Sequence, residues 1–567
     1  MKLEGGRQRD TTQVKVLSPE ILLVSEVDAV HIAVDKTLIA IKGQGDKSPT
    51  GSEAVSSCQR IDMNLGEPGY PLKCGSMRQQ VLKGEEPQKI FRQSDYPIVS
   101  VKQGNACGEK GIEGTGQDIR ETSATFKGGE WMATKLNILT NRAKENPKLR
   151  FTSLIHLINE GSLLECLREL KKDKAPGIDG VRLEEYEVNK DANIKGLIDR
   201  MKLWKYRPQP TRRAYIPKTD GNMRPLGIPT IEDKVVQMGI KKILEAIFET
   251  DFSDVSYGFR PNRNCHQALD VLAKAVMTKP VNVVVDMDIE KFFDTIDHKW
   301  LMKCLEQRIA DRNLLRLIGR FLKAGVMEDG KFSDTDKGSP QGGILSPVLA
   351  NIYLHFILDL WFERHVKRQL KGYACLIRYA DDFVVCFQND DEAKAFGEML
   401  RQRLDKFGLK TAKDKSRIIN FGRRAWQKAK ETGEKLATFD FLGFTHYCDK
   451  TRHGKFKLGR RTAGSKFRQK MKAANLWLKG VRNLVELREW WRILGKKLIG
   501  HYNYYGISGN TPQIRKFYQR ILALVYKWIN RRSQKKSYNW EQFGRFLKYN
   551  PLLRPKIYHS TYTLSSY

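Results

Sequence analysis

Two adjacent aspartates, Asp381 and Asp382, stand between two short apolar segments, CLIRY and FVVCF. This order predicts a hairpin whose tip carries both carboxylates. An aspartate pair in a turn ordinarily hydrogen-bonds only its own backbone. Asp288 changes this interpretation, because it follows a β-branched run, residues 281–287, that predicts a buried central strand. We therefore expect three carboxylates to converge at one edge of a sheet.

Three converging carboxylates repel one another unless cations lie between them. Mg²⁺ prefers carboxylate and water oxygens and is often completed by substrate phosphates. Two such ions about 3.5–4 Å apart stabilise the attacking and leaving oxygens of an in-line phosphoryl transfer. Addition of a nucleotide to a 3′-hydroxyl is one such reaction, so we expect two Mg²⁺ ions as cofactors.

Positive charge is in large excess and is unevenly distributed. The 567 residues contain 100 Lys and Arg against 65 Asp and Glu, a net charge of +35. Residues 1–130 hold 17 basic and 18 acidic side chains, whereas residues 451–567 hold 27 basic and three acidic ones together with 20 aromatic side chains. A field of this sign attracts polymers of phosphate. The last fifth of the chain is therefore expected to bind nucleic acid.

The composition also excludes several classes of protein. A chain of 567 residues is too long for a single small binding module. No apolar run approaches the ~18–20 residues of a membrane span, and the N-terminus lacks a signal-peptide pattern. The nine cysteines include no C-x-x-C pair, which argues against a zinc finger and for a reducing compartment. We expect a cytoplasmic protein, in the bacterial cytoplasm or nucleoid or in an organelle, with no membrane partner.

The start of the folded region is expected near residue 131. Residues 1–130 have few aromatic residues and only short apolar runs, which predicts a weakly ordered extension. We favour translated sequence with no fold of its own for this segment. Met132 is then a candidate internal start.

The next segments predict helices and one hairpin. Ser162 and Glu165 stand at the spacing of a capping box before a helical pattern. Residues 212–228 predict a basic hairpin, and residues 231–248 predict the helix that it feeds. Strands mixed with helices in this order predict an α+β fold with a mainly antiparallel sheet.

From about Gly464 the pattern is helical to the end of the chain. Apolar residues recur every three or four positions, as in helices that bury one face. They are Leu484, Leu487, Trp491, Leu494 and Leu498, followed by Ile514, Tyr518, Ile521, Val525 and Trp528. Basic residues occupy another face, which predicts a small basic helical domain.

Six blocks occur in one order along the chain: KAPGIDG, IPKTDGNMRPLGIP, SYGFRPNRNCHQAL, DIEKFFDTIDH, GSPQGGILSP and IRYADDFVV. Together they resemble the group II intron-encoded reverse transcriptase and maturase family. The similarity covers roughly residues 165–450. It extends into WWRILGKKLIGHYNYYG and WINRRSQKKSYNWEQF, which resemble the thumb of that family, called domain X.

The resemblance implies an α+β right-hand polymerase fold, with helical and hairpin fingers, an antiparallel-sheet palm and an all-α basic thumb. It places the N-terminal extension at residues 1–130 and the fingers, with N-terminal RNA-binding helices, at residues 131–275. The palm with the catalytic carboxylates then covers residues 276–450, and the thumb, or domain X, covers residues 451–567.

By the same resemblance, Asp288, Asp381 and Asp382 match the catalytic, metal-binding triad. Four further residues near the triad are interpreted as scaffold or surface groups: Asp286, Asp294, Asp297 and His298. Many relatives carry a C-terminal DNA endonuclease with paired cysteines. This chain ends at Tyr567 without such pairs, so we do not expect it to cleave the second DNA strand.

Four positions match residues that bind the incoming nucleotide. Lys218 and Arg224 match finger residues that grip the triphosphate, a task suited to a point charge and a guanidinium. Phe293 matches the bulky residue under the sugar that disfavours a 2′-hydroxyl, and Gln341 matches a residue that lines the nucleotide pocket. From the residues alone, a core position is favoured for Phe293, because it adjoins a buried strand, and the two cations can also be solvated hairpin charges.

The basic C-terminal region is expected to bind RNA. Arg531, Arg532, Lys535 and Lys536 are the residues predicted to contact the RNA backbone. Four tyrosines either stack on bases or pack internally: Tyr502, Tyr504, Tyr505 and Tyr538. The resemblance implies that this region and the N-terminal fingers bind the intron RNA that encodes the protein.

The sequence thus predicts an RNA-directed DNA polymerase that also assists splicing and retrohoming. Its expected partners are group II intron RNA, an RNA template with a DNA primer, dNTPs and target DNA. One alternative is a splicing maturase without polymerase activity, against which the intact triad argues. Another is a domesticated reverse transcriptase of defence or repair, whose specific module would be residues 1–130.

Overall fold

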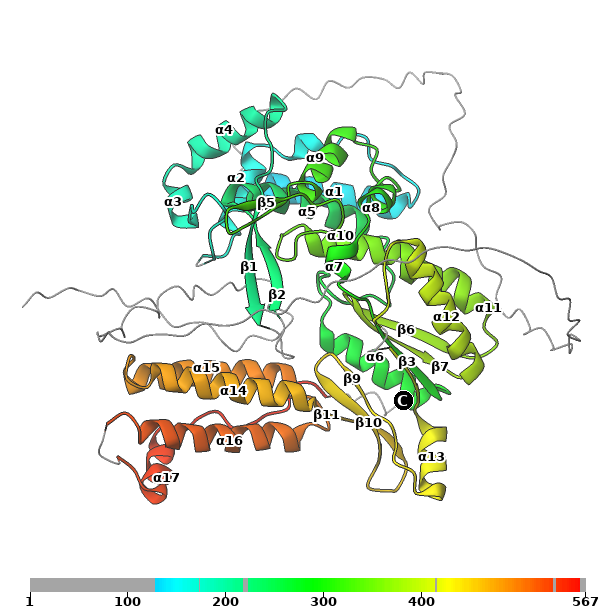
Figure 1. Cartoon of the computed structure of the whole chain (residues 1–567), viewed down its shortest axis with the longest axis vertical. Helices are drawn as coiled ribbons and strands as arrows, with labels where there is room; N and C mark the ends of the chain where they lie inside the picture. The colour runs from blue at the N-terminus through cyan, green and yellow to red at the C-terminus, as the bar shows by residue number, and fades with distance from the viewer. Residues whose placement is uncertain (1–127, 173, 218–222, 413–415, 534–536, 561–567) are drawn as a thin grey trace, which may run out of the picture. The chain divides into compact units, whose positions relative to one another are not determined.

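The computed structural model describes residues 128–172, 174–217, 223–412, 416–533 and 537–560 (Figure 1). These residues all belong to one compact unit. The extension predicted at residues 1–130 lies almost wholly outside them. The described part is a mixture of helices with mainly antiparallel sheets, so the predicted α+β class is confirmed.

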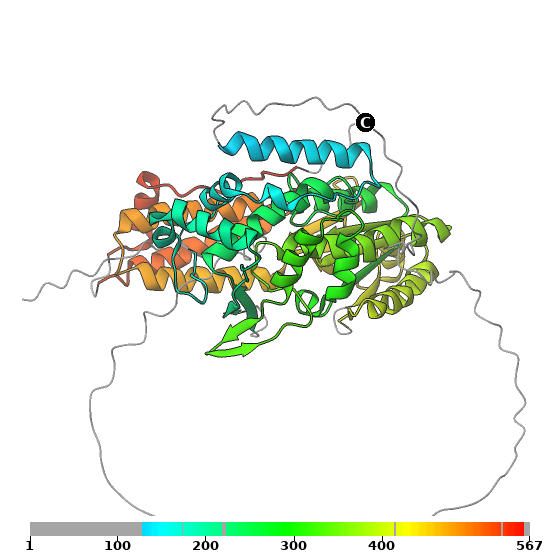
Figure 2. The same ribbon diagram turned by 90° about the horizontal axis from the view of Figure 1, so that it is seen from above.

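Helices dominate the first part of the described chain, residues 128–278. They are α1 (Gly128–Glu145), α2 (Glu160–Arg168), α3 (Leu183–Val188), α4 (Lys190–Lys202), α5 (Ile231–Phe248) and α6 (Cys265–Thr278). Helix α5 has the bounds that the sequence predicts, and it begins at an N-cap, Thr230, whose side chain accepts from the Asp233 amide. Helix α1 packs on α2 and α5, and Figure 2 shows it lying along one side of the other N-terminal helices.

Helix α2 begins three residues earlier than the capping box predicted. Its N-cap is Asn159, and Ser162 is the third helical residue that returns the reciprocal hydrogen bond. The prediction that Ser162 caps the helix with Glu165 as its partner is therefore wrong. The Ser162 hydroxyl replaces the usual Glu or Gln as the third residue of the capping box, and the helix begins at Glu160, with Leu163 and Leu167 buried.

The predicted basic hairpin forms strands β1 (Thr211–Pro217) and β2 (Met223–Ile228). They belong to a sheet of order β2-β1-β4-β5, with β4 (Val326–Glu328) running parallel to β1 and β5 (Lys331–Ser333) at its edge. Between this hairpin and β4, the chain also forms α7 (Phe292–Thr295), α8 (His298–Leu305) and α9 (Arg312–Leu322).

The central sheet has the order β6-β7-β3-β8 and is antiparallel throughout. Its strands are β3 (Val283–Asp288), β6 (Ala374–Tyr379), β7 (Asp382–Phe387) and β8 (Arg417–Asn420). Val283 and Val285 belong to one apolar cluster and Val284 to another, so both faces of β3 are covered. This explains why β3 is a continuous apolar run rather than an alternating one.

Helices cover this sheet. Helix α12 (Asp390–Lys406) packs on β3 and β7, and α6 packs on β6. The segment before β6 consists of α10 (Ser346–Leu354), two wider π-helical turns (His355–Asp359 and Phe362–Val366) and α11 (Lys367–Gln369). Helix α13 (Arg423–Thr432) follows β8 and packs on a second antiparallel sheet.

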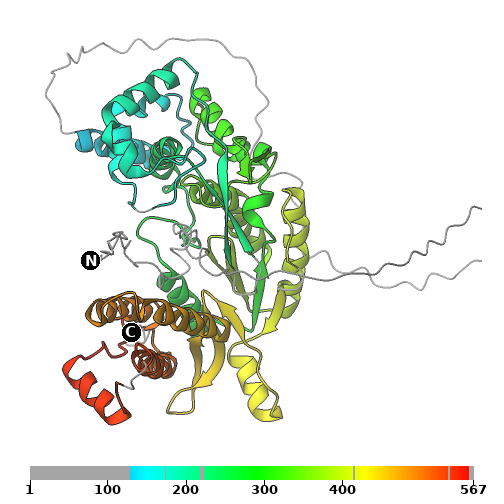
Figure 3. The ribbon, with the colours of Figure 1, turned by 60° about the vertical axis from the view of Figure 1, so that its left-hand side comes forward.

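That second sheet has the order β11-β10-β9, from β9 (Phe439–Phe441), β10 (Phe444–Lys450) and β11 (Phe456–Thr462). Its β10–β11 hairpin crosses the boundary between residues 450 and 451. Helix α14 (Gly464–Val481) starts where the sequence predicts, and Figure 3 shows it continuing directly from this sheet.

The C-terminal helices bury a common apolar core. After α14 come α15 (Leu487–Tyr505), α16 (Thr511–Ile529) and α17 (Trp540–Tyr549). Ile514, Ile521, Val525 and Trp528 are buried as predicted, whereas Leu484 is 77% exposed because it precedes the first turn of α15. None of the described helices combines the length and the apolarity that a membrane crossing requires.

Candidate active site

The three predicted aspartates lie at one end of neighbouring strands. The antiparallel register of β3 and β7 pairs Asp288 directly with Asp382. Asp381 precedes Asp382 in the turn after β6, where Ala380 has a left-handed φ of 58°. All three side chains are half-buried. The structure thus confirms that the three positions converge at one edge of the sheet.

The charges at this edge act strongly on one another. Burial, followed by repulsion from Asp381, Asp286 and Asp288, raises the pKa of Asp382 to about 8, although an amide hydrogen bond from Leu442 opposes the rise. Burial and the charge of Asp288 also raise the pKa of Asp381. Burial is the larger cause of both pKa shifts, and the repulsion among the carboxylates is the part that a bound cation relieves.

Carboxylate oxygens at this edge are the donors that Mg²⁺ prefers. Within the described ranges, however, no group of three acidic, histidine or cysteine side chains is already arranged as a metal-binding cluster. The donor set and its unbalanced charge fit a divalent cation, and metal binding by the triad stays a prediction.

A buried arginine holds the turn that carries Asp381. The guanidinium of Arg378 donates to Asp359 through Nε at 2.7 Å and Nη2 at 2.5 Å, and both side chains are fully buried. Its Nη1 donates to Asn351 Oδ1 at 3.1 Å and to the Ala380 carbonyl oxygen at 2.9 Å. Arg378 therefore fixes the left-handed residue Ala380 next to Asp381 and Asp382, a role that we did not predict.

The SYGFRPNR block packs against the same turn. The Tyr257 amide donates to the Arg378 carbonyl at 2.9 Å, and the Arg378 amide donates to the Val255 carbonyl at 2.8 Å. Gly258 lies so close to Ala380 that an added Cβ would overlap the Ala380 amide nitrogen. A glycine is required here by close approach of two backbones rather than by its φ angle.

Of the four predicted nucleotide-binding residues, Lys218 lies outside the described residues, Gln341 lies in the loop before α10, and the backbone of Phe293 contacts that loop. The Gln341 carbonyl accepts from the Gly227 amide of β2 at 2.6 Å, and the Phe293 carbonyl accepts from the Ser339 amide at 2.7 Å. Arg224, exposed on β2, lies near enough for its charge to lower the pKa of Asp381 against the larger effect of burial. The side chain of Phe293 is half-buried, so it lies neither wholly in the core nor fully in solvent.

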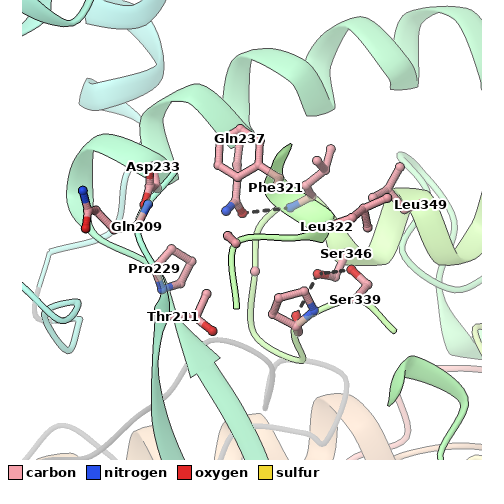
Figure 4. A pocket seen from close by; sticks show the side chains of 14 residues that line it. Gln209, Thr211, Pro229, Asp233, Gln237, Phe321, Leu322, Ser339, Ser346 and Leu349 are labelled. Carbon is pink, nitrogen blue, oxygen red and sulfur yellow. Dashed lines mark hydrogen bonds between the residues drawn. The ribbon is translucent and has the colours of Figure 1, made fainter. Parts of the chain in front are cut away.

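A narrow cavity lies behind this loop, between α5 and the β1–β2 hairpin (Figure 4). On its wall, Gln237 Oε1 accepts from the Ile344 amide at 2.9 Å. Ser346 Oγ donates to the Pro340 carbonyl at 2.7 Å and accepts from Ser339 Oγ at 2.8 Å. Buried side chains thus satisfy the polar groups of the loop from behind and hold its backbone in place.

The neighbouring polar residues mostly have structural partners. Asp286 forms an ion pair with Arg417 at 3.0 Å. Asp297 caps α8 by accepting from the Trp300 amide, and a ring nitrogen of His298 lies 2.6 Å from the Gly338 carbonyl oxygen. The scaffold interpretation of these three residues is confirmed, and Asp294 is exposed.

The predicted RNA-binding residues are only partly described. Arg531 and Arg532 are exposed just after α16, whereas Lys535 and Lys536 lie outside the described residues. The four tyrosines considered for base stacking pack internally, at least in part. Tyr502 and Tyr505 are buried, Tyr504 and Tyr538 are half-buried, and the Tyr504 hydroxyl donates to the Leu442 carbonyl at 3.0 Å.

Comparison with known proteins agrees with this geometry. The family described as "Reverse transcriptase (RNA-dependent DNA polymerase)" matches residues 216–446. The chain is 33% identical to Protein YkfC of Escherichia coli over 338 residues, which cover 52% of the chain and 88% of the relative.

Two intron-encoded or intron-related proteins are also similar. Group II intron-encoded protein LtrA of Lactococcus lactis is 39% identical over 231 residues, 40% of this chain and 38% of LtrA. Nuclear intron maturase 4 of Arabidopsis thaliana is 31% identical over 131 residues, 23% of this chain and 16% of that protein. The chain belongs to the family of group II intron reverse transcriptases and maturases, whose enzyme class is RNA-directed DNA polymerase.

Proposed function

We propose that the chain copies RNA into DNA at the edge formed by β3 and β7. The observation that carries this proposal is the register that places Asp288 opposite Asp382, with Asp381 in the adjoining turn. In this proposal the central sheet is the palm of a right-hand polymerase. The N-terminal helices and the β1–β2 hairpin are its fingers, and α14–α17 form its thumb, or domain X.

The three aspartates hold two Mg²⁺ ions in this proposal. When bound, these ions supply stabilisation of the attacking 3′-oxygen and of the leaving pyrophosphate oxygens. Arg224 binds the triphosphate of the incoming dNTP, together with Lys218. Phe293 occupies the space that a 2′-hydroxyl would need, and Gln341 orients the nucleotide from its loop. Arg378 acts only through the turn and does not touch the substrate.

The second part of the proposal is that the protein binds its own group II intron RNA and assists splicing and retrohoming into target DNA. The excess of 27 basic over three acidic side chains in residues 451–567 supports a phosphate-rich partner. No splicing chemistry is required of the protein. It favours the spliced RNA fold by binding that fold more tightly than its misfolded alternatives.

Extension of a DNA primer on an RNA template tests the polymerase proposal. The purified chain with Mg²⁺ and dNTPs should extend the primer, and EDTA should stop the reaction. Replacement of dNTPs by NTPs should reduce incorporation strongly in the unaltered chain and less in Phe293→Ala. No extension by a folded, metal-supplied protein would refute the proposal.

A separate assay tests the splicing proposal. Intron RNA transcribed with its exons should splice at low Mg²⁺ only when the protein is added. The aspartate variants that cannot extend a primer should still support splicing, because binding does not need the triad. If the unaltered protein extends primers but leaves splicing unchanged, the splicing proposal fails while the polymerase proposal stands.

A further inference from the structure

Trp204 presents its indole at the surface directly after α4. Its side chain is 37% exposed, and its backbone has a left-handed φ of 59°. This conformation is unfavourable for a bulky residue. Arg207 Nη1 donates to the Trp204 carbonyl oxygen at 2.6 Å, so a specific hydrogen bond holds the turn.

Two further arginines flank the same ring. The guanidinium carbons of Arg316 and Arg320 lie 5.5 and 5.6 Å from the indole centroid, and the two residues are one turn apart on α9. Arg320 and Arg207 both donate to the carbonyl oxygen of Tyr206, each at 3.1 Å. Tyr206 is itself buried, and its hydroxyl donates to Asp233 Oδ1 at 2.5 Å. The cluster is therefore anchored in the core.

The charge of this cluster is not balanced locally. Among the residues that the structure describes, no carboxylate forms an ion pair with Arg207, Arg316 or Arg320, and α9 contains no acidic residue. By contrast, Arg200 on the adjacent helix α4 is paired with Glu232 at 2.7 Å. Burial and then repulsion from Arg207 and Arg316 lower the pKa of Arg320. Further exposed cations stand near these residues in the sequence: Lys202, Lys205, Arg312 and Lys323.

An exposed aromatic ring among unpaired guanidinium groups is the arrangement that binds unpaired nucleotides. Bases stack on the ring or on guanidinium planes, and the phosphates between them neutralise the cations. A duplex offers phosphates but keeps its bases stacked internally, so it cannot use the ring. None of these residues lies on the strands that carry the catalytic carboxylates.

We propose that Trp204, Arg207, Arg316 and Arg320 form a second, non-catalytic site that binds an unpaired segment of RNA. The choice of RNA rests on the proposed splicing function. The site adds affinity and orientation to the intron complex and takes no part in nucleotide addition.

The test measures binding of a labelled RNA hairpin with an unpaired loop to the full chain across a series of salt concentrations. Trp204→Ala should weaken binding about fivefold to 100-fold, the range that stacking of one base supports. Arg316→Gln with Arg320→Gln should lower the slope of log affinity against log salt by about 1.4, because two phosphate contacts are lost at about 0.7 each.

Matched variants separate this site from general charge effects. Lys394→Gln with Arg401→Gln removes two cations from α12 and should leave the binding of the probe largely unchanged. Trp204→Phe should keep most of the affinity, and Trp204→Gly, which relieves the left-handed backbone, should bind as weakly as Trp204→Ala. An equal loss of RNA affinity in the α12 variant would overturn the proposal. It would show that the RNA responds to the overall positive charge of the protein rather than to a defined site.

Two further measurements distinguish this proposal from the function on which it rests. Extension of a short primer on a short RNA template should be the same for Trp204→Ala and the unaltered chain. A fully paired RNA duplex without a loop should bind more weakly than the RNA hairpin, because its bases stay stacked internally. If Trp204→Ala binds the RNA normally while extension is intact, the second site is refuted and the polymerase proposal survives.

Discussion

The carboxylate edge and the C-terminal helices both concentrate charge of one sign, but at different depths. At the edge, half-buried aspartates sit on a sheet whose two faces are covered, and the pKa of Asp382 rises to about 8. In residues 451–567, the charge excess is larger, with 27 basic and three acidic side chains, yet many of these cations lie on exposed helix faces.

The difference in depth determines what each region can do. Solvent and salt screen exposed charges, so a basic surface attracts a polyanion collectively and tolerates the loss of single residues. Charges at the edge of a packed core are screened less, so each carboxylate affects the ionisation of its neighbours. Nucleotide addition is therefore expected to depend on individual carboxylates at the edge. Binding of nucleic acid is expected to depend on the summed positive charge of the C-terminal helices.

The sharpest test of this contrast is Asp381→Asn, which keeps the shape of the side chain and removes its charge. Primer extension should fall on the order of a thousandfold or more. When several groups act as a unit in catalysis, removing one of them costs nearly as much activity as removing them all. Asp286→Asn is the matched control, since Asp286 lies two residues before Asp288 on β3 but pairs with Arg417. Comparable losses in both variants would show that total charge matters more than position.

The next largest effect is expected at the buried cation of the same region. Arg378→Met leaves Asp359 ionised and unpaired in the core, which should lower the free energy of unfolding by about 3–5 kcal/mol. Urea denaturation measures this loss. The double variant Arg378→Met with Asp359→Leu should regain most of the stability but not the primer extension, because the Ala380 carbonyl still lacks its donor. Full recovery of extension would refute the positioning role.

The C-terminal helices contain one exception to their exposed charge. Lys497 is 7% exposed and lies 5.0 Å from the centre of the Trp477 ring, and burial lowers its pKa to about 8. An unfolded lysine has a pKa of about 10.4. Between these pH values the unfolded chain binds a proton that the folded chain has lost, so stability rises with pH through this window.

Lys497→Met should therefore raise the free energy of unfolding by about 2 kcal/mol at pH 7, less than the full titration value because the Trp477 face attracts the cation. The gain over the unaltered chain should shrink as the pH rises from 8 to 10. Denaturation at several pH values measures it. Lys479→Met, at an exposed position of α14, should show no such dependence, and a constant gain across pH would contradict the assignment.

Sequence patterns predict the carboxylate edge well because its strands are short, apolar and covered on both faces. The run before Asp288 and the two runs around Asp381 and Asp382 have no other way to bury their side chains. The hairpin before α5 and the bounds of α5 also follow from local signals, since turn residues and an N-cap mark them.

Contacts between distant segments could not be predicted in this way. Arg378 and Asp359 are 19 residues apart, and a π-helical turn brings Asp359 to the strand. An arginine in an apolar strand indicates that a buried acidic partner exists, because charged side chains are rarely buried unpaired, but it does not show which residue that partner is. The Trp204 cluster depends on α9, which is more than a hundred residues away in sequence. The cap of α2 was predicted wrongly for a different reason, because its reciprocal partner is the Ser162 hydroxyl rather than the Glu or Gln of the usual pattern.

The smallest expected effect tests whether the two regions are coupled. The Tyr504 hydroxyl of α15 donates to the Leu442 carbonyl, and the Leu442 amide in turn bonds Asp382. Leu442 has a left-handed φ of 49°, so this turn needs support. Tyr504→Phe removes one hydrogen bond, worth about 1 kcal/mol, and should lower kcat for primer extension about fivefold with little change in KM.

Tyr502→Phe provides the comparison for this change. Tyr502 lies two residues earlier on α15, and its buried hydroxyl has no hydrogen-bond partner among the described residues. Removing that hydroxyl should leave kcat unchanged and should stabilise the chain slightly, because an unsatisfied polar group is lost. If both variants lower kcat equally, the effect reflects packing of the helix, and the bond from Tyr504 to Leu442 does not connect the basic helices to the carboxylate edge.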